Sequence, residues 1–125
     1  METKTKFDLE SRLIDFAVKI IKVTETMSPS MAGNHLAGQL VRSGTAPALL
    51  YGEAQSAESR RDFIHKIRLV LKELRESQCS LQIILKAGLS KKEELVRESA
   101  VECRELVAIF TRSADTAKKN LLAEK

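Results

Sequence analysis

A long uninterrupted apolar repeat limits the possible folds of this chain more than any other feature of the sequence. Over residues 57–87 the spacing between apolar positions alternates between four and three. The repeat consists of Phe63, Ile67, Val70, Leu74, Ser77, Leu81 and Ile84, with Ser77 as its one polar member. It predicts one helix about 45 Å long at 1.5 Å per residue. Gly88 predicts the helix end, because glycine readily adopts the left-handed conformation found there.

The first amphipathic segment, at about residues 7–27, has more apolar surface than one helix contact requires. Its main stripe consists of Leu9, Leu13, Phe16, Ala17, Ile20 and Met27. Ile14, Val18 and Ile21 form a second stripe beside the first. The combined width exceeds that of a single intramolecular seam, so the sequence predicts a second contact surface on this helix.

Two more segments complete the helical pattern. Ser28 and Pro29 predict a stop and a new start before a helix at about residues 30–55. Gly44 and Pro47 are expected to interrupt that helix and to kink it near residues 42–45, since proline lacks an N–H donor. A last helix at about residues 91–121 is expected to begin with a capping box, which Ser90 and Glu93 would form.

These segments predict an all-α fold, an antiparallel up-and-down four-helix bundle that forms a single domain over residues 1–125. The links between the helices are too short for long crossovers, so sequence neighbours should pack antiparallel. The chain has only 5 Gly and 2 Pro, which leaves little turn chemistry for a many-stranded sheet. A chain of 125 residues is long enough to form one core.

The sequence predicts a cytoplasmic protein that does not enter membranes. Residues 1–6 are polar and charged and lack the apolar stretch of a secretory signal. No apolar run approaches the roughly 20 residues that cross a bilayer. Cys79 and Cys103 match no zinc or redox spacing and are expected to be reduced thiols.

No residue pattern predicts catalysis, a metal or a cofactor. Asp62 and His65 are one turn apart and could form part of a metal site or an acid–base pair, and Glu53 is a further carboxylate for an enzyme hypothesis. A metal site needs at least one more ligand, and such neighbours are common on helix surfaces. The chain is therefore expected not to be an enzyme, and an enzyme that uses Asp62, His65 or Glu53 is kept only as the third hypothesis.

Basic residues concentrate on the first half of the third segment and predict a nucleic-acid-binding surface. The candidates are Arg42, Arg60, Arg61, Lys66, Arg68, Lys72 and Arg75. They would contact phosphates, although mixed charges at helical spacing also describe an ordinary solvated face. A polar network is expected near the turn between the second and third helices. In it, Glu53, Asp62 and Glu73 would pair with Arg42, Lys66 and Lys72.

Several stretches resemble a known bacterial family, the four-helix bundle proteins encoded in intervening sequences of large-subunit ribosomal RNA genes. The resemblance covers about residues 7–88. It rests on residues 39–45 (QLVRSGT), 51–55 (YGEAQ), 59–66 (SRRDFIHK) and 71–76 (LKELRE). The family pattern matches Arg42, Ser43, Gly44, Thr45, Glu53, Ala54, Ser59, Asp62, Phe63, Lys66, Lys72, Glu73 and Glu76. The sequence departs from it at Leu50, often an Asn, and at residues 78–80, where an aromatic-rich segment is replaced.

The resemblance implies a ring-like homopentamer without enzymatic activity. A related branch is the basic accessory protein of diversity-generating retroelements, which implies RNA or DNA and a reverse transcriptase as partners. Together with the wide apolar surface of residues 7–27, it leads to the hypothesis of a homo-oligomer that scaffolds or binds nucleic acid. The competing hypothesis is a protein-interaction adaptor that does not bind nucleic acid.

Overall fold

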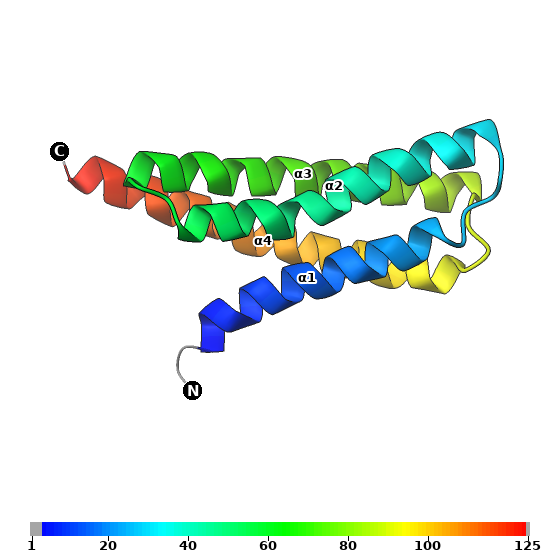
Figure 1. The fold of residues 1–125 in the computed structure, drawn as a ribbon, viewed down its shortest axis with the longest axis horizontal. Helices are drawn as coiled ribbons and strands as arrows, with labels where there is room; N and C mark the ends of the chain where they lie inside the picture. Colours follow the sequence, from blue (N-terminus) through cyan, green and yellow to red (C-terminus); the bar gives the residue numbers. More distant parts are fainter. Residues whose placement is uncertain (1–3, 125) are drawn as a thin grey trace.

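Four α-helices make up the structure, as the apolar repeats predict. The computed structural model describes the backbone of residues 4–124 and the side chains of residues 9–124, so part of the segment 1–6 discussed above lies outside the described residues. The helices are α1 (Lys4–Thr24), α2 (Met31–Gln55), α3 (Arg60–Ala87) and α4 (Glu93–Ala123). Each helix packs against its sequence neighbour, and α1 also contacts α4 (Figure 1). The predicted all-α up-and-down four-helix bundle is confirmed.

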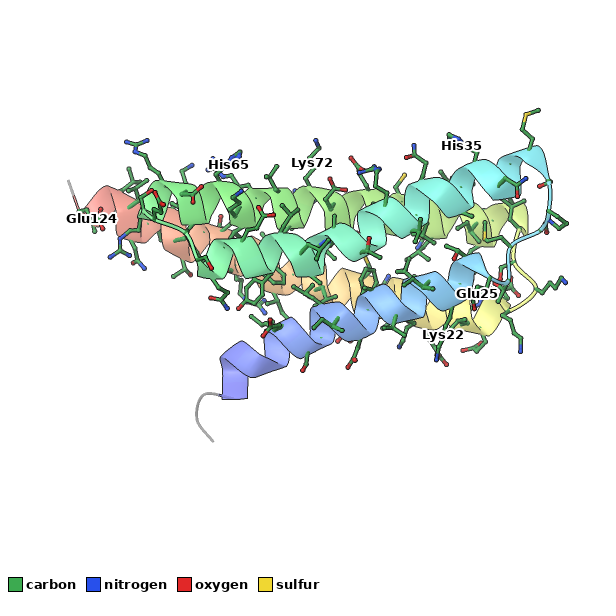
Figure 2. The ribbon with its side chains drawn as sticks, viewed as in Figure 1. Lys22, Glu25, His35, His65, Lys72 and Glu124 are labelled. Atoms are coloured by element: carbon green, nitrogen blue, oxygen red, sulfur yellow. The ribbon has the colours of Figure 1, made fainter. Side chains whose placement is uncertain are left out.

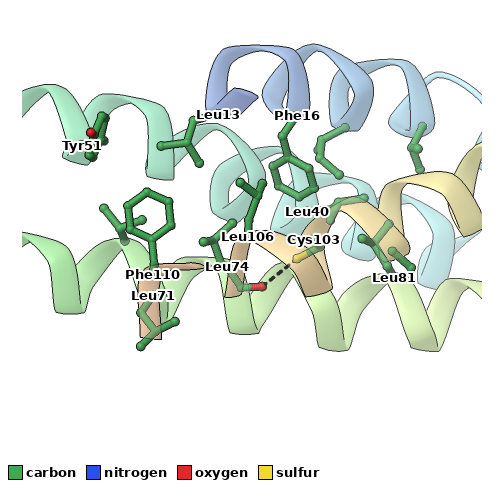
Figure 3. Close-up of a cluster of buried hydrophobic side chains, with 14 of the residues drawn as sticks. Leu13, Phe16, Leu40, Tyr51, Leu71, Leu74, Leu81, Cys103, Leu106 and Phe110 are labelled. Carbon is green, nitrogen blue, oxygen red and sulfur yellow. Dashed lines mark hydrogen bonds between the residues drawn. The ribbon is translucent and has the colours of Figure 1, made fainter. Parts of the chain in front are cut away.

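The predicted apolar stripes of the four helices meet in one core. The largest side chains with almost no exposed surface are Leu13, Phe16, Ile20, Val23, Leu40, Ile67, Val70, Leu74, Leu81, Ile84, Leu106 and Phe110. Figure 3 shows part of this cluster, including Tyr51, whose ring meets the edge of Phe110 at a centroid distance of 5.6 Å. Burial of each large aliphatic or aromatic side chain contributes about 1.5–3 kcal/mol.

Helix α2 is continuous from Met31 to Gln55 with Pro47 inside it, so Gly44 and Pro47 do not end the helix. Figure 1 shows that α2 bends along its length without breaking. Ser43, Gly44 and Pro47 are buried, so the small residues face the core. A Cβ atom on Gly44 would lie 2.6 Å from Cγ2 of Ile20, so α1 lies directly against the backbone of α2 at this point.

Two serine caps and one glycine determine three of the helix ends, and the cap of α2 is Ser30, not Ser28. Ser30 caps α2 by accepting a hydrogen bond from the Gly33 amide at 3.0 Å. Ser59 caps α3, so that helix begins at residue 60 and not at residue 57. Gly88 ends α3 with φ 64°, as the sequence predicts.

The predicted capping box at the start of α4 does not form, because Ser90 has other partners. Helix α4 begins at Glu93, after Lys92, which makes no side-chain cap. The Ser90 hydroxyl accepts a hydrogen bond from the Lys92 amide at 3.0 Å and lies 2.6 Å from Thr26 Oγ1.

The loop between α1 and α2 pairs with the loop between α3 and α4. The Ser28 amide donates to the Leu89 carbonyl at 2.7 Å, and the Lys91 amide donates to the Thr26 carbonyl at 2.9 Å. These bonds surround an antiparallel bridge between Met27 and Ser90. The two loops therefore hold one end of the bundle together.

Helix α1 diverges from the bundle toward the opposite end (Figure 1). Its main polar connection to α4 is Arg12, which binds Glu102 at 2.8 Å and Glu105 at 3.1 Å. Within residues 4–124, no helix combines the length and the apolar character needed to cross a membrane.

Candidate nucleic-acid interface

The structure divides the seven predicted nucleic-acid-binding residues into two groups. Three of them form ion pairs within the chain: Arg42 with Glu73 and Glu76, Arg60 with Glu124, and Lys66 with Glu53. The other four, Arg61, Arg68, Lys72 and Arg75, are exposed and form no ion pair with any described residue. Only this second group has cationic heads that are not already occupied by carboxylates.

The four unpaired residues lie on one stripe of α3. Arg61, Arg68, Lys72 and Arg75, with His65 between the first two, are separated by alternating steps of four and three. This spacing places them on one helix face, over about 21 Å along the axis. Figure 2 shows His65 and Lys72 projecting outward from α3.

Part of this stripe forms one wall of a groove between α3 and α4, which we name the basic groove. It has a volume of about 740 Å³. The lining residues from α3 are Arg68, Leu71, Lys72, Arg75, Glu76 and Cys79, and those from α4 are Thr111, Ala114, Asp115 and Lys118. Leu71 and Ala114 are the apolar part of this lining, and most of the other side chains are charged or polar.

The charges of the basic groove favour an anion. Arg68, Lys72, Arg75 and Lys118 contribute four positive charges, against the two carboxylates of Glu76 and Asp115, so the formal charge of the lining is +2. Glu76 is also shared with Arg42, which lies 2.8 Å away on the α2 side. The hydrogen bond to Glu76 raises the pKa of Arg42, because it favours the charged guanidinium.

Sequence reasoning missed Lys118, which belongs to the fourth helix. Arg68 and Lys118 line the same groove, as do Arg75 and Thr111. These residues occupy matching positions because α3 and α4 run antiparallel. Placing the α4 sequence beside α3 in antiparallel register would have found Lys118.

The predicted polar network consists of two separate ion-pair groups. Glu53 binds Lys66 at 2.7 Å near the turn between α2 and α3, and this hydrogen bond raises the pKa of Lys66. Glu73 binds Arg42 at 3.2 Å, about 10 Å further along α3 at 1.5 Å per residue. Asp62 lies in the first turn of α3, where its amide donates to the Ser59 hydroxyl at 3.0 Å. Its carboxylate forms no ion pair with a described residue, but its charge also contributes to the raised pKa of Lys66.

The histidines and cysteines do not gather into a reactive site. His35 and His65 are exposed on different helices. Cys103 is buried, and burial raises the pKa of its thiol to about 12. Its S–H donates to the Leu74 carbonyl at 3.2 Å (Figure 3). Cys79 is exposed at the edge of the basic groove. Among the described residues, no three His, Cys, Asp or Glu side chains are placed to hold a metal ion.

A second surface, on α1, matches the wide apolar pattern of the sequence. Ile14, Val18 and Ile21 remain 49%, 45% and 40% exposed. They are spaced by four and three residues, so they form one outward stripe about 10 Å long. We name these three residues the α1 stripe. Among the described side chains of α1, these three are the large apolar ones that the bundle leaves exposed.

Comparison with known proteins supports the fold. No family model matches the chain, and no curated protein matches it. One similar solved structure is a crystal structure of a protein with unknown function from the S23 ribosomal protein family from Bacteroides thetaiotaomicron. The two chains share 24% identity at a TM-score of 0.75, and the match covers 84% of this chain and 96% of that chain. The similarity identifies the same four-helix architecture in a solved protein.

Proposed function

We propose that this protein is a non-enzymatic homo-oligomer that binds nucleic acid through the phosphate backbone, and that the basic groove is the binding site. The observation that supports the proposal is the convergence of Arg68, Lys72, Arg75 and Lys118 from two helices without ion pairs to described residues. Cations that are not neutralised within the chain are free to displace counterions from phosphates.

The lining of the basic groove predicts binding that does not depend on base sequence. Its residues include no aromatic side chain on which a base could stack. Arginine and lysine contacts to phosphates fix position but carry no direct sequence information. RNA and DNA strands of equal length should therefore bind with similar salt dependence.

Self-association would repeat the basic groove on each subunit. The exposed α1 stripe supports this part of the proposal, because covering a contiguous apolar surface lowers the free energy of the protein in water. The resemblance of residues 7–88 to ring-forming bundles makes a pentamer the expected assembly. Several positive grooves on one particle would raise the local potential and the affinity for a long polyanion.

Fluorescence anisotropy with labelled single-stranded RNA and DNA tests nucleic-acid binding. The variant Arg68→Ala/Lys72→Ala/Arg75→Ala should weaken binding and reduce the slope of log K against log salt by about two to three between about 50 and 200 mM salt. The control Lys91→Ala/Lys92→Ala removes exposed lysines from the distant loop and should leave the slope nearly unchanged. Equal effects of the two variants would refute the basic groove as the site.

Light scattering coupled to size-exclusion chromatography tests the oligomer independently. The wild-type chain should elute as an assembly at micromolar concentration, with five subunits as the expected number. A monomeric mass at that concentration would refute self-association without affecting the anisotropy result.

A protein-interaction adaptor is the second candidate, and the α1 stripe is the observation that favours it. In that case the stripe would contact a different protein, for which the resemblance suggests a reverse transcriptase. A complex that survives nuclease treatment, and that Val18→Asp disrupts while Lys91→Ala/Lys92→Ala does not, would favour this function. Absence of anisotropy changes with RNA and DNA would be expected in the same protein.

A further inference from the structure

Among the described residues, α1 leaves part of the bundle uncovered at the end where it diverges. The ion pair of Arg12 with Glu102 and Glu105 fixes the antiparallel register of α1 and α4. Counting back from Arg12 along α1, Lys4 reaches only to about positions 110–113 of α4. The last third of α4 therefore extends past the first described residue of α1, and Figure 1 shows the two helices separating toward this end.

A second groove lies on this uncovered part of the bundle, and we name it the terminal groove. It has a volume of about 480 Å³, and its apolar part is Phe63, Ile109 and Ala117. Phe63 lies one turn before the core residue Ile67, so the groove continues the core line of α3. The terminal groove thus occupies the position where a fourth helix would complete the core.

The α1 stripe is an apolar helix surface of the kind that would fill the terminal groove. Ile14, Val18 and Ile21 extend over about 10 Å, whereas the α4 wall of the terminal groove extends over about 16 Å at 1.5 Å per residue. Aliphatic side chains at this spacing are the usual anchors of a helix that packs in an apolar groove. The stripe faces away from its own bundle, so it is available to another molecule.

The charges around the two surfaces are complementary. Glu10 and Asp15 are exposed on α1 beside the stripe and form no ion pair with a described residue. Arg60 and Arg112 line the terminal groove. Arg60 already pairs with Glu124, whereas Arg112 is exposed and has no ion-pair partner among the described side chains. Lys22 is also exposed beside the stripe, so this helix face carries two carboxylates against one lysine. A net acidic helix face would therefore meet a basic rim.

We propose that α1 of a second copy of this chain docks its stripe in the terminal groove. The inference rests on the homo-oligomer of the proposed function and specifies its contact. The two surfaces differ, so the contact is head-to-tail, and such contacts close into rings when the rotation permits. The basic groove uses a different face of α4, through Thr111, Ala114 and Lys118, and stays open in this arrangement.

Charge reversal tests the contact in the full-length chain. Asp15→Arg and Arg112→Glu should each weaken self-association roughly tenfold, measured by sedimentation velocity. A mixture of the two variants should restore association between unlike chains, because each contact between them joins opposite charges. A ring of five keeps at least one contact between like variants, so the mixture should form open or even-numbered assemblies. Arg104→Glu is the matched control, since Arg104 is exposed on α4 outside the terminal groove. Circular dichroism should show that all variants keep the helical content of the wild type.

Each other result overturns the proposal in a distinct way. If Asp15→Arg weakens association but Arg112→Glu behaves like Arg104→Glu, the stripe contacts another surface. If the double variant in one chain restores the wild-type behaviour but the mixture does not, α1 closes on its own bundle. If the wild type assembles and neither reversal matters, the oligomer stands and this contact fails. A monomeric wild type removes both the oligomer and the contact.

Discussion

Replacement of Gly44 by alanine tests the close packing of α1 on α2. A Cβ atom at this position would lie 2.6 Å from Cγ2 and 2.8 Å from Cγ1 of Ile20. Both distances are about 1 Å shorter than the usual carbon–carbon separation of about 3.5–4.0 Å. Ile20 is fully buried, and a β-branched side chain in a helix has one preferred rotamer, so it cannot turn away. Relief of the clash therefore requires α1 to move.

The net effect is the difference between two opposing terms. Alanine in place of glycine inside a helix stabilises by about 1 kcal/mol. Overpacking of a tight core costs about 1–3 kcal/mol, and the rigid neighbour favours the upper part of that range. We expect Gly44→Ala to lower the free energy of unfolding by about 1–2 kcal/mol. Gly38→Ala is the control, since nothing lies within 4 Å of its Cβ position, and it should stabilise by about 1 kcal/mol.

A double-mutant cycle with Ile20→Ala isolates the clash. Without the Ile20 branches, Gly44→Ala should become stabilising by about 1 kcal/mol, which corresponds to a coupling of about 2–3 kcal/mol. Urea unfolding followed by circular dichroism, at a fixed protein concentration, measures each term. Because Ile20→Ala alone costs about 2–5 kcal/mol, the cycle is best made in a Gly38→Ala background. Equal stabilisation by Gly44→Ala and Gly38→Ala, or zero coupling, would refute the packing described for Gly44.

Three further predictions concern the core and its thiols. In the native protein a maleimide reagent should label Cys79, which is exposed, and not Cys103, which is buried; labelling of both at equal rates, followed by mass spectrometry, would contradict this burial. Burial raises the pKa of Cys103 from 9.0 to about 12. The thiol therefore stabilises the fold fully below about pH 9 and loses this contribution as pH rises toward 12, at about 1.4 kcal/mol per unit. Cys103→Ala should flatten the decline of unfolding free energy in this range, and parallel pH profiles would count against the prediction. Ser43 and Ser77 share a buried hydrogen bond of 2.8 Å, so Ser77→Ala should cost about 1–3 kcal/mol in urea unfolding while Ser43→Ala/Ser77→Ala costs less. A larger loss in the double variant would show that the pair itself is stabilising.

The sequence predicted the features that depend on local physics. Apolar spacing located the four helices and most of the core, and Gly88 marked the end of α3, because periodicity and backbone preferences act within a few residues. The uncovered stripe of Ile14, Val18 and Ile21 was also visible as excess apolar width. Residues close together in the chain determine all three features.

Features that depend on tertiary partners were not predicted. Pro47 is buried inside α2 and does not end the helix, and the sequence could not show that this residue faces the core. Ser90 does not cap α4, because the opposite loop provides Thr26 as a partner. The sequence also could not show which cations are occupied, since Arg60 pairs with Glu124, 64 residues away. Only the three-dimensional structure shows which cationic side chains are paired with carboxylates and which are available.

The pairing of the two loops makes the bundle mechanically asymmetric. Backbone hydrogen bonds join residues 26–28 to residues 89–91, and among the described residues no such backbone pairing joins the start of α1 to another helix. Helix α1 should therefore pivot about the paired loops, with displacements that grow toward the start of the helix. The exchange rates of the backbone amides of α1 should form a gradient, slow next to the paired loops and progressively faster toward the start of the helix.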